Sequence, residues 1–282
     1  GSEMCIRDSL AGAMFCSYIF MDILSPIKDL MWDTKGWDST AFGTMQGSET
    51  FLNVFVFFLI FAGIILDKMG VRFTAILSGA VMLVGATINW YALTDMFAGS
   101  NLEVWFNEHL NYIPGFDELG VSPFYKGMPA SAKFSAIGFM IFGCGVEMAG
   151  ITVSRGIVKW FKGREMALAM GSEMALARLG VATCMIFSPM FARLGGEVSV
   201  SRSVAFGVVL LMIALIMFIV YAFMDKKLDS QTGEAEEKDD PFKLSDLGKI
   251  LTDSGFWLVA LLCVLYYSCL LYTSDAADDL TR

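Results

Sequence analysis

Charged residues are scarce in this sequence. Only 17% of its 282 residues are Asp, Glu, Lys or Arg, whereas 56% are hydrophobic and the mean hydropathy is +0.60. Soluble domains carry about 25% charged residues, so this deficit argues against a soluble globular protein. A chain whose helices face lipid is expected instead, and for such a chain length does not predict the number of soluble domains.

Signatures of metal sites, disulfides and catalysis are also missing. His109 is the single histidine, and the six cysteines are scattered without a Cys-x-x-Cys pair or a Cys/His cluster. We therefore expect no metal site and no disulfide framework. Neither a carboxylate pair beside a nucleophile nor a phosphate-binding loop is apparent, so an enzyme is the least expected class. No cofactor and no nucleic-acid partner are expected.

Six stretches are long and apolar enough to cross a bilayer, which takes about 20 mainly apolar residues. They cover roughly 10–32 (interrupted by Asp22 and Pro26), 44–66, 73–94, 134–158, 166–191 and 203–224. The last of these is apolar all round, whereas a helix of a soluble bundle would keep a polar face. The sequence therefore predicts an all-α membrane protein with a six-helix transmembrane bundle over residues 10–225.

A polar segment follows the predicted bundle. Residues 226–253 are rich in both signs of charge and predict a cytoplasmic linker. Within it, FKLSDLGKIL from Phe242 places its apolar residues on one helical face, which predicts an interfacial helix. Residues 254–268 then begin a seventh transmembrane helix. Six spans, a charged linker and a further span are typical of a transporter built from two halves.

The lysines and arginines predict the orientation, because cytoplasmic loops carry an excess of them. The loops after spans two, four and six hold Lys68, Arg72, Arg155, Lys159, Lys162, Arg164, Lys226, Lys227, Lys238, Lys243 and Lys249. The opposite loops hold Lys28, Lys35, Lys126, Lys133, Arg193 and Arg202. The excess predicts a cytoplasmic N-terminus in a multi-pass protein of the cell (inner) membrane.

Both ends of the chain resemble translated adapter DNA of the kind used to prepare sequencing libraries. MCIRDS at the start and CLLYTSDAAD near the end carry this resemblance. Such segments are excluded from fold reasoning. We therefore expect residues 1–9 and 269–282 to be adapter-like scars that are unstructured. Natural sequence would run from about Leu10 to Ser268, and the second half of the transporter would be a missing partner.

A ten-residue motif lies between spans two and three. It reads Gly63-Ile-Ile-Leu-Asp67-Lys68-Met-Gly70-Val-Arg72 and resembles the GxLaDrxGrk signature of the major facilitator superfamily. Gly63 would permit close helix approach and Gly70 a tight turn. Asp67 can cap a helix or pair with a base, while Lys68 and Arg72 would hold the loop at the headgroups. The resemblance implies a conformational role, latching the two halves on the cytoplasmic side.

A narrower resemblance points to one branch of that superfamily, the lysosomal dipeptide transporters and their bacterial relatives. There the linker after span four reads WFKGKEL and the next helix carries MARIG; here Trp160–Met166 and Leu176–Gly180 match them. Upstream, FGCGVE (Phe142–Glu147) is similar to FGIGGE, and SYIFMD (Ser17–Asp22) to SYFCYD. The resemblance covers most of residues 15–185 and implies transport of short peptides by alternating access.

Two opposite charges lie mid-span on consecutive predicted helices, Glu147 and Arg178. Ionisable groups inside the membrane are expensive and are candidate functional groups. The resemblance implies that they clamp the amino and carboxylate ends of the peptide. A zwitterion needs one fixed charge of each sign, and arginine offers a bidentate fork for a carboxylate. The alternative is a buried Glu147–Arg178 ion pair that ties the two helices together.

Further candidate substrate-binding residues lie on the first two spans. Gln46, Glu49 and Asn53 share one face of a helix, as their spacing requires. This polar stripe lines either the cavity or the outer vestibule. Asp22, two turns into the first span, would contact substrate, a cation or a proton, or would be a satisfied polar group of the bundle. Tyr18 lies one turn earlier on the same face.

One position departs from the dipeptide branch. Where that branch carries an arginine early in span four, in GRFVFG, this sequence has Phe139 in GFMIFG. Proton coupling through that arginine is therefore not expected, although Glu147 or Asp22 could carry a proton. The expected substrate is a short peptide or another small zwitterion. The alternatives are a small organic anion bound by Arg178 alone, and a membrane receptor or sensor without a transport cycle.

Overall fold

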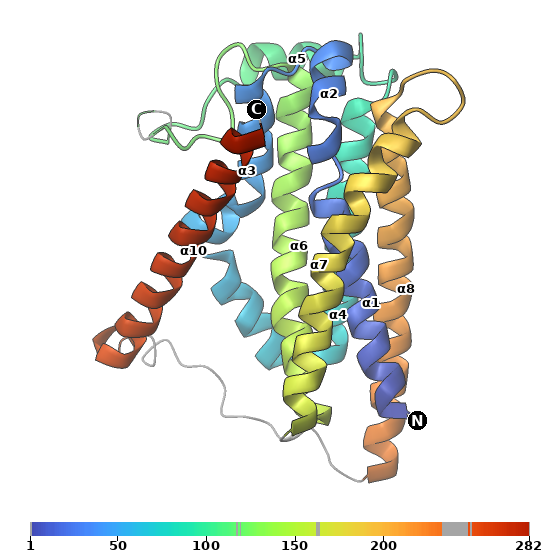
Figure 1. The fold of residues 1–282 in the computed structure, drawn as a ribbon, viewed down its shortest axis with the longest axis vertical. Coiled ribbons are helices and arrows are strands. Elements are labelled where there is room, and N and C mark those ends of the chain that lie inside the picture. Colours follow the sequence, from blue (N-terminus) through green and yellow to red (C-terminus); the bar gives the residue numbers. More distant parts are fainter. Residues whose placement is uncertain are drawn as a thin grey trace. The chain divides into compact units, whose positions relative to one another are not determined.

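The computed structural model describes residues 2–116, 118, 120–161, 164–232, 248 and 250–281. The chain divides into two compact units, Gly1–Glu237 and Lys238–Arg282, which are considered separately. The first unit contains α1 (Ser2–Met21), the 3-10 helix η1 (Ser25–Ile27), α2 (Lys28–Lys35), α3 (Ser39–Phe55), α4 (Phe58–Leu93), α5 (Asn101–His109), α6 (Ala130–Trp160), α7 (Arg164–Ala192) and α8 (Val200–Thr232) (Figure 1). In the second unit, α10 spans Ser254–Thr281.

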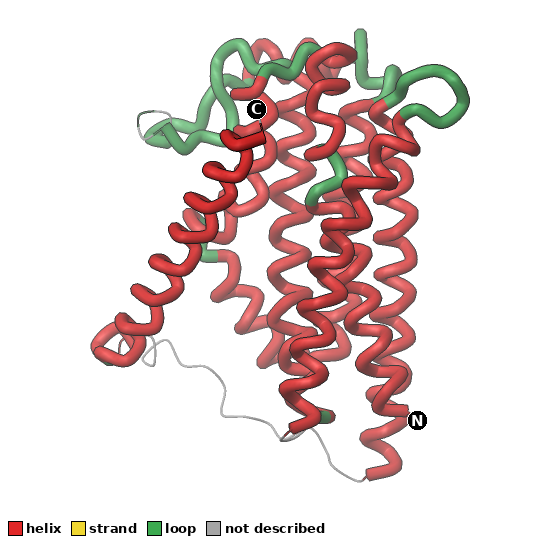
Figure 2. Tube along the Cα trace, in the orientation of Figure 1, coloured by secondary structure: helices red, strands yellow, loops and turns green. Residues whose placement is uncertain are grey.

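The described residues form helices and connecting loops without a β-strand, which confirms the all-α class (Figure 2). Five helices are long and apolar enough to cross a membrane: Met4–Lys35, Phe58–Leu93, Ala130–Trp160, Glu165–Ala192 and Val200–Gln231. Their length and composition make the chain a multi-pass membrane protein. The shorter apolar helix Ser254–Cys269 includes the predicted start of a seventh span.

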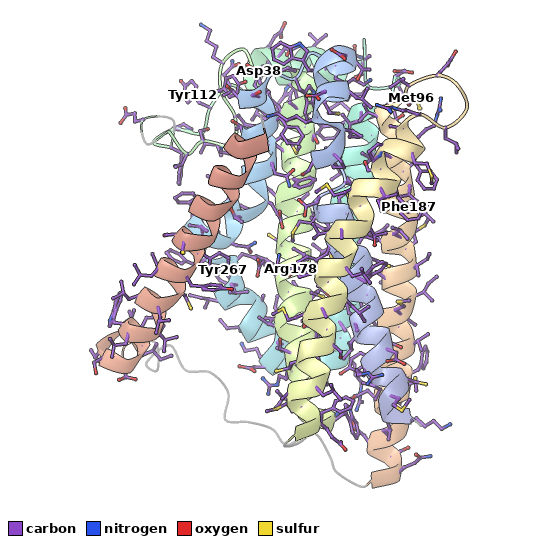
Figure 3. All side chains as sticks on the ribbon, in the orientation of Figure 1. Asp38, Met96, Tyr112, Arg178, Phe187 and Tyr267 are labelled. Atoms are coloured by element: carbon purple, nitrogen blue, oxygen red, sulfur yellow. The ribbon has the colours of Figure 1, made fainter. Side chains whose placement is uncertain are left out.

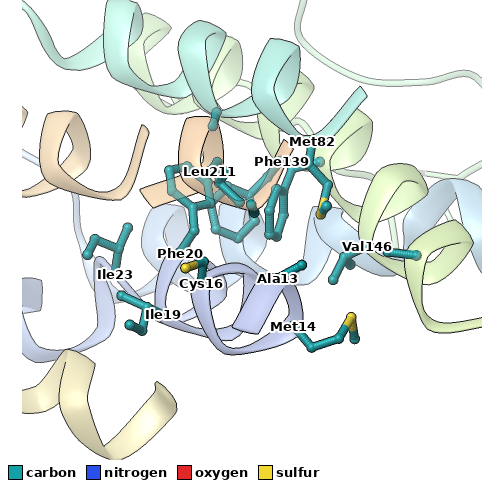
Figure 4. Packing of buried hydrophobic residues seen from close by; sticks show 14 of the residues in the cluster. Ala13, Met14, Cys16, Ile19, Phe20, Ile23, Met82, Phe139, Val146 and Leu211 are labelled. Carbon is teal, nitrogen blue, oxygen red and sulfur yellow. The ribbon is translucent and has the colours of Figure 1, made fainter. Parts of the chain in front are cut away.

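The core of the first unit lies where α1, α4, α6 and α8 meet. The side chains of Phe20, Met82, Phe139 and Leu211, one from each helix, are fully buried there (Figure 4). The long helices α4 and α6 approach closely, and a Cβ added at Gly138 would lie 2.7 Å from the carbonyl oxygen of Gly85. Small residues allow this approach, as is usual between membrane helices.

The first span is broken, as Asp22 and Pro26 predicted. Helix α1 ends at Met21, residues 22–24 form turns, and η1 begins at Ser25 with the proline in its first turn. Proline supplies no backbone N–H and its ring clashes with the preceding turn, so a proline inside a helix kinks or breaks it, and here the α-helix ends before Pro26. A regular α-helix then begins again at Lys28 as α2.

The prediction of a continuous second span over 44–66 is wrong. Helix α3 ends at Phe55 and α4 begins at Phe58. Between them Phe57 has φ 55° and ψ 37°, the left-handed region, which interrupts the regular ladder of helical hydrogen bonds. With 17 residues, α3 is shorter than a membrane-spanning helix, and α4, which joins two helical segments at Gly70, counts once among the five membrane-length helices. The second predicted span therefore consists of α3 and the first segment of α4, and the third predicted span of the second segment of α4.

Helix α4 contains the turn between the second and third predicted spans. Gly70 lies inside it with φ 80° and ψ 165°, where two helical segments join at a kink. That conformation is available essentially to glycine alone. The predicted role of Gly70 in a tight turn is therefore confirmed.

The expectation of unstructured ends is wrong. Residues 2–9 are the first turns of α1, and Ile6 is fully buried in the hydrophobic core while Met4 is 58% exposed. Ile6 precedes the buried Leu10 by four residues, so both lie on the same face of α1, which packs against α8. Residues 269–281 are likewise helical, within α10.

The predicted linker also begins later than residue 226. Helix α8 continues to Thr232, because the charged residues after its apolar segment extend the helix rather than end it. Residues 233–247 and 249, which hold most of the predicted linker and interfacial helix, lie outside the described residues.

Candidate functional site

Helices α3 and α6 touch at the centre of the candidate site. A Cβ at Gly143 of α6 would collide with the carbonyl oxygen of Glu49 on α3, so the absence of a side chain there permits the contact. One turn later on α3, the Nδ2 of Asn53 donates a hydrogen bond to the carbonyl oxygen of Gly143 at 3.3 Å. Glu147 follows Gly143 by four residues and therefore extends from the same face of α6.

Three carboxylates gather around this contact. Glu49 lies within electrostatic range of both Glu147 and Asp22, which come from α6 and from the break after α1. The Glu49 side chain is only 9% exposed, and within the described part of the chain its carboxylate has no hydrogen-bond or ion-pair partner. A buried charge without a partner costs free energy, so the cluster favours a cationic group or a proton beside it.

Arg178 supplies a positive charge from α7. It lies at mid-height of that helix (Figure 3), is exposed, and acts electrostatically on Asp22. Among the described residues it forms no ion pair within 4.0 Å. The structure therefore brings Asp22 toward Arg178 and Glu49 toward Glu147. The direct Glu147–Arg178 pair considered from the sequence is not formed.

The remaining candidates lie around these charges. Gln46 donates from Nε2 to the carbonyl oxygen of Met21 at 3.1 Å. Its Oε1 and the Oδ1 of Asn53 are buried, and neither has a hydrogen-bond partner in the described chain. Tyr18, one turn before the break in α1, is half-buried and packs against the core. The polar stripe of α3 thus faces α1 and α6.

A cavity beside α3 is separate from the candidate substrate residues. It has a volume of about 280 Å³ and is lined by Thr44, Gly47, Ser48, Thr50, Phe51, Phe55, Gly120, Val121, Ser122 and Pro123. Apart from Thr50, these residues of α3 lie on the side of the helix that faces away from Gln46, Glu49 and Asn53. The cavity therefore contains none of the candidate substrate residues.

The motif from Gly63 to Arg72 forms ion pairs with other residues of the first unit. Asp67 accepts from Nη1 of Arg155 at 2.6 Å, which confirms the prediction that this aspartate pairs with a base. Lys68 is exposed. A Cβ at Gly63 would meet nothing within 4 Å, so the close approach predicted there is absent from the described structure.

Arg72 has a role that the sequence did not predict. Instead of pointing only to the headgroups, its Nε donates to Oδ2 of Asp225 at 2.5 Å, and the guanidinium also pairs with Asp229. Lys159 joins both aspartates at 2.9–3.1 Å, and the indole of Trp160 donates to Asp225 at 2.6 Å. This network, called here the end network, ties α4, α6 and α8 together.

Phe139 occupies the position where the dipeptide branch has an arginine. Its ring is fully buried and lies 6.1 Å from Phe20 and 5.8 Å from Phe142, measured between ring centroids. The position is filled by the aromatic core, which explains why no charge is accommodated there.

Long apolar helices that carry a buried carboxylate and further charges beside it define a multi-pass membrane protein with polar groups within its helical bundle. The family profile described as Major Facilitator Superfamily matches residues 10–277. The chain belongs to this superfamily.

Curated relatives match about half of the chain. The lysosomal dipeptide transporter MFSD1 of Gallus gallus is 27% identical over 140 residues, which are 47% of this chain and 31% of the relative. The human protein of that name is 27% identical over 138 residues, 46% and 29% of the two chains. The match thus spans about three tenths of the relatives' own length. No solved structure is significantly similar to the chain.

Proposed function

We propose that the chain forms part of a secondary transporter that moves a small zwitterion, foremost a short peptide, by alternating access. Family membership supports transport rather than catalysis. The observation that carries the substrate class is a set of charges without an ion-pair partner among the described residues: the carboxylates Asp22, Glu49 and Glu147, and the exposed Arg178, which acts on Asp22. The relatives named as dipeptide transporters support the same class.

Each charge then has a role. Arg178 binds the carboxylate of the substrate through two parallel hydrogen bonds, and Glu147 binds its amino group. Glu49 adds negative charge beside Glu147. Asn53, whose Oδ1 lacks a partner in the described chain, offers a neutral acceptor. Three carboxylates would repel a small organic anion, so this arrangement favours a zwitterion over the anion considered from the sequence.

The test uses a complete transporter that carries this chain as its first half, reconstituted in liposomes. Glu147→Gln and Arg178→Lys should each reduce dipeptide uptake about tenfold or more, since a hydrogen bond to a charged group contributes about 1.5–3 kcal/mol. Matched controls are Glu108→Gln and Arg193→Lys, which change the same groups outside the spans. Normal uptake in both site variants would overturn the peptide clamp, whereas equal loss in the controls would indicate a folding defect.

We also propose that the chain lies in the cell membrane with its N-terminus on the cytoplasmic side. Six passes then place Asn101 outside and Ser230 inside. Single cysteines at these two positions should react with a membrane-impermeant maleimide from opposite faces of intact cells and inverted vesicles. Reaction of both positions from the same face would contradict the topology.

A further inference from the structure

The break after α1 alters the hydrogen bonds of three backbone carbonyl groups, and among the described residues those of Met21 and Ile23 are left without a backbone donor. In a continuous helix, the carbonyl of Met21 would accept from Ser25 N–H, that of Asp22 from residue 26, and that of Ile23 from Ile27. Residue 26 is proline and has no N–H. The N–H of Ser25 instead bonds the Asp22 carbonyl at 3.0 Å, and that of Ile27 bonds the carbonyl of Leu24 at 3.1 Å.

Three side chains from other helices satisfy these carbonyls. Gln46 of α3 donates to Met21 O at 3.1 Å. The thiol of Cys184 on α7 donates to Asp22 O at 3.2 Å, and the hydroxyl of Ser188, one turn further along α7, donates to Ile23 O at 2.5 Å. Inside a bilayer no water replaces such bonds, and broken helices persist only where neighbouring groups satisfy the freed backbone.

Helix α7 donates two of these hydrogen bonds to the break in α1, and it also carries Arg178, whose positive charge acts on Asp22. Cys184 and Ser188 are both fully buried on α7, six and ten residues after Arg178. Ser188 is itself fixed, because its carbonyl oxygen accepts from the hydroxyl of Ser203 on α8 at 2.6 Å. Among the described residues, the Asp22 carboxylate accepts a hydrogen bond only from Ser25, at a long 3.4 Å.

We infer that Gln46, Cys184 and Ser188 are positioning residues that fix the break in α1 and so hold the Asp22 carboxylate in the field of Arg178. A slide of α7 along α1 would break two hydrogen bonds and the electrostatic contact together. The position of Asp22 follows from the geometry alone; its meaning for substrate binding rests on the proposed function.

The experiment measures the field at residue 22 in this chain, in membranes and without any transport. Asp22→Cys is made the single thiol, with Cys184→Ser to keep a donor at that position. The other cysteines, which are Cys5, Cys16, Cys144, Cys263 and Cys269, become alanine. Rates of reaction are compared between an anionic and a cationic methanethiosulfonate of similar size. Because Glu49 also acts on residue 22, the informative quantity is the change in the ratio of the anionic to the cationic rate, which Arg178→Gln should reduce about tenfold.

The two positioning residues of α7 are then removed one at a time. Replacing the serine at 184 by alanine, or Ser188→Ala, should lower the ratio by about threefold or more as the break relaxes. Ser188→Thr, which keeps the hydroxyl, should restore it. Thr183→Ala is the matched control on α7, because the hydroxyl of Thr183 bonds only its own helix, at Leu179 O.

Each outcome decides the inference. An unchanged ratio in both alanine variants, while Arg178→Gln lowers it, would overturn the role of Cys184 and Ser188. A ratio that does not respond to Arg178→Gln would overturn the contact itself. The serine and alanine variants at 184 differ only in the donor, so that pair gives an answer even where Ser188→Ala fails to fold. A failed peptide-uptake experiment would leave this result standing.

Discussion

The end network and the candidate substrate site, called here the mid-membrane site and formed by Asp22, Glu49, Glu147 and Arg178, both contain several charges, but only the charges of the end network form ion pairs among the described residues. At the end network, Arg72 and Lys159 share Asp225 and Asp229, and nearby Arg155 holds Asp67. In the mid-membrane site, the carboxylate of Glu49 and the guanidinium of Arg178 have no ion-pair partner among the described residues. Paired charges join helices, whereas unpaired buried charges cost free energy and suit a ligand.

Asp225→Asn should cause the largest loss of stability, because it removes the central carboxylate of the end network. The Asp225 side chain is 1% exposed and accepts from Arg72, Lys159 and Trp160. Removing one partner of a buried ion pair costs about 3–5 kcal/mol, because the remaining charges lose their compensation. The cost is measured as the decrease in the free energy of unfolding of the purified chain, followed as the SDS concentration is raised. Glu108→Gln, at an exposed position of α5, is the control, and a loss no larger than in the control would show that the network does not hold the helices.

Gly138→Ala should have a smaller effect through packing alone. A Cβ there would lie 2.7 Å from Gly85 O and 2.8 Å from the backbone nitrogen of Asn89, so α4 and α6 must separate. Overpacking of this kind costs about 1–3 kcal/mol. Gly150→Ala lies on the same helix with nothing within 4 Å and should leave stability nearly unchanged. Equal unfolding curves for the two variants would contradict the close α4–α6 contact.

Glu49→Gln should act in the opposite direction from Asp225→Asn, although both changes replace a carboxylate by an amide. Because Glu49 is 9% exposed and unpaired within the described chain, its neutralisation should raise the free energy of unfolding by about 1 kcal/mol. The same SDS titration applies, with Glu108→Gln as the exposed control. Clear destabilisation by Glu49→Gln would mean that its carboxylate already has a structural partner.

Local sequence signals predicted the features that depend on single residues. Apolar length marked the spans, Pro26 the break in the first span, and Gly70 the turn in α4. The break at Phe57 could not be predicted, because neither glycine nor proline marks it and a left-handed phenylalanine is stabilised only by its surroundings. The burial of Ile6 could not be predicted from the resemblance of the terminal segment to adapter DNA, because its burial follows from its position four residues before Leu10 in α1.

In the candidate site too, some features could be predicted from the sequence and others could not. The intramembrane charges were visible in the sequence, since ionisable residues are rare inside apolar spans. Their neighbours were not, because pairing depends on which helices pack together. Arg72 and Asp225 are 153 residues apart in the chain. Asp225 sits at the end of a strongly apolar segment, and this is the one sequence signal that could have marked it as structural.

Blocked peptides test the central claim, that the mid-membrane charges receive both ends of a zwitterion. In the transporter that carries this chain, inhibition of labelled dipeptide uptake is compared for one dipeptide, its N-acetylated form and its C-amidated form. Each block removes one charge that Glu147 or Arg178 would bind, so both should inhibit about tenfold more weakly than the free peptide. Equal inhibition by all three would contradict the account, because the charges would then not recognise the peptide ends.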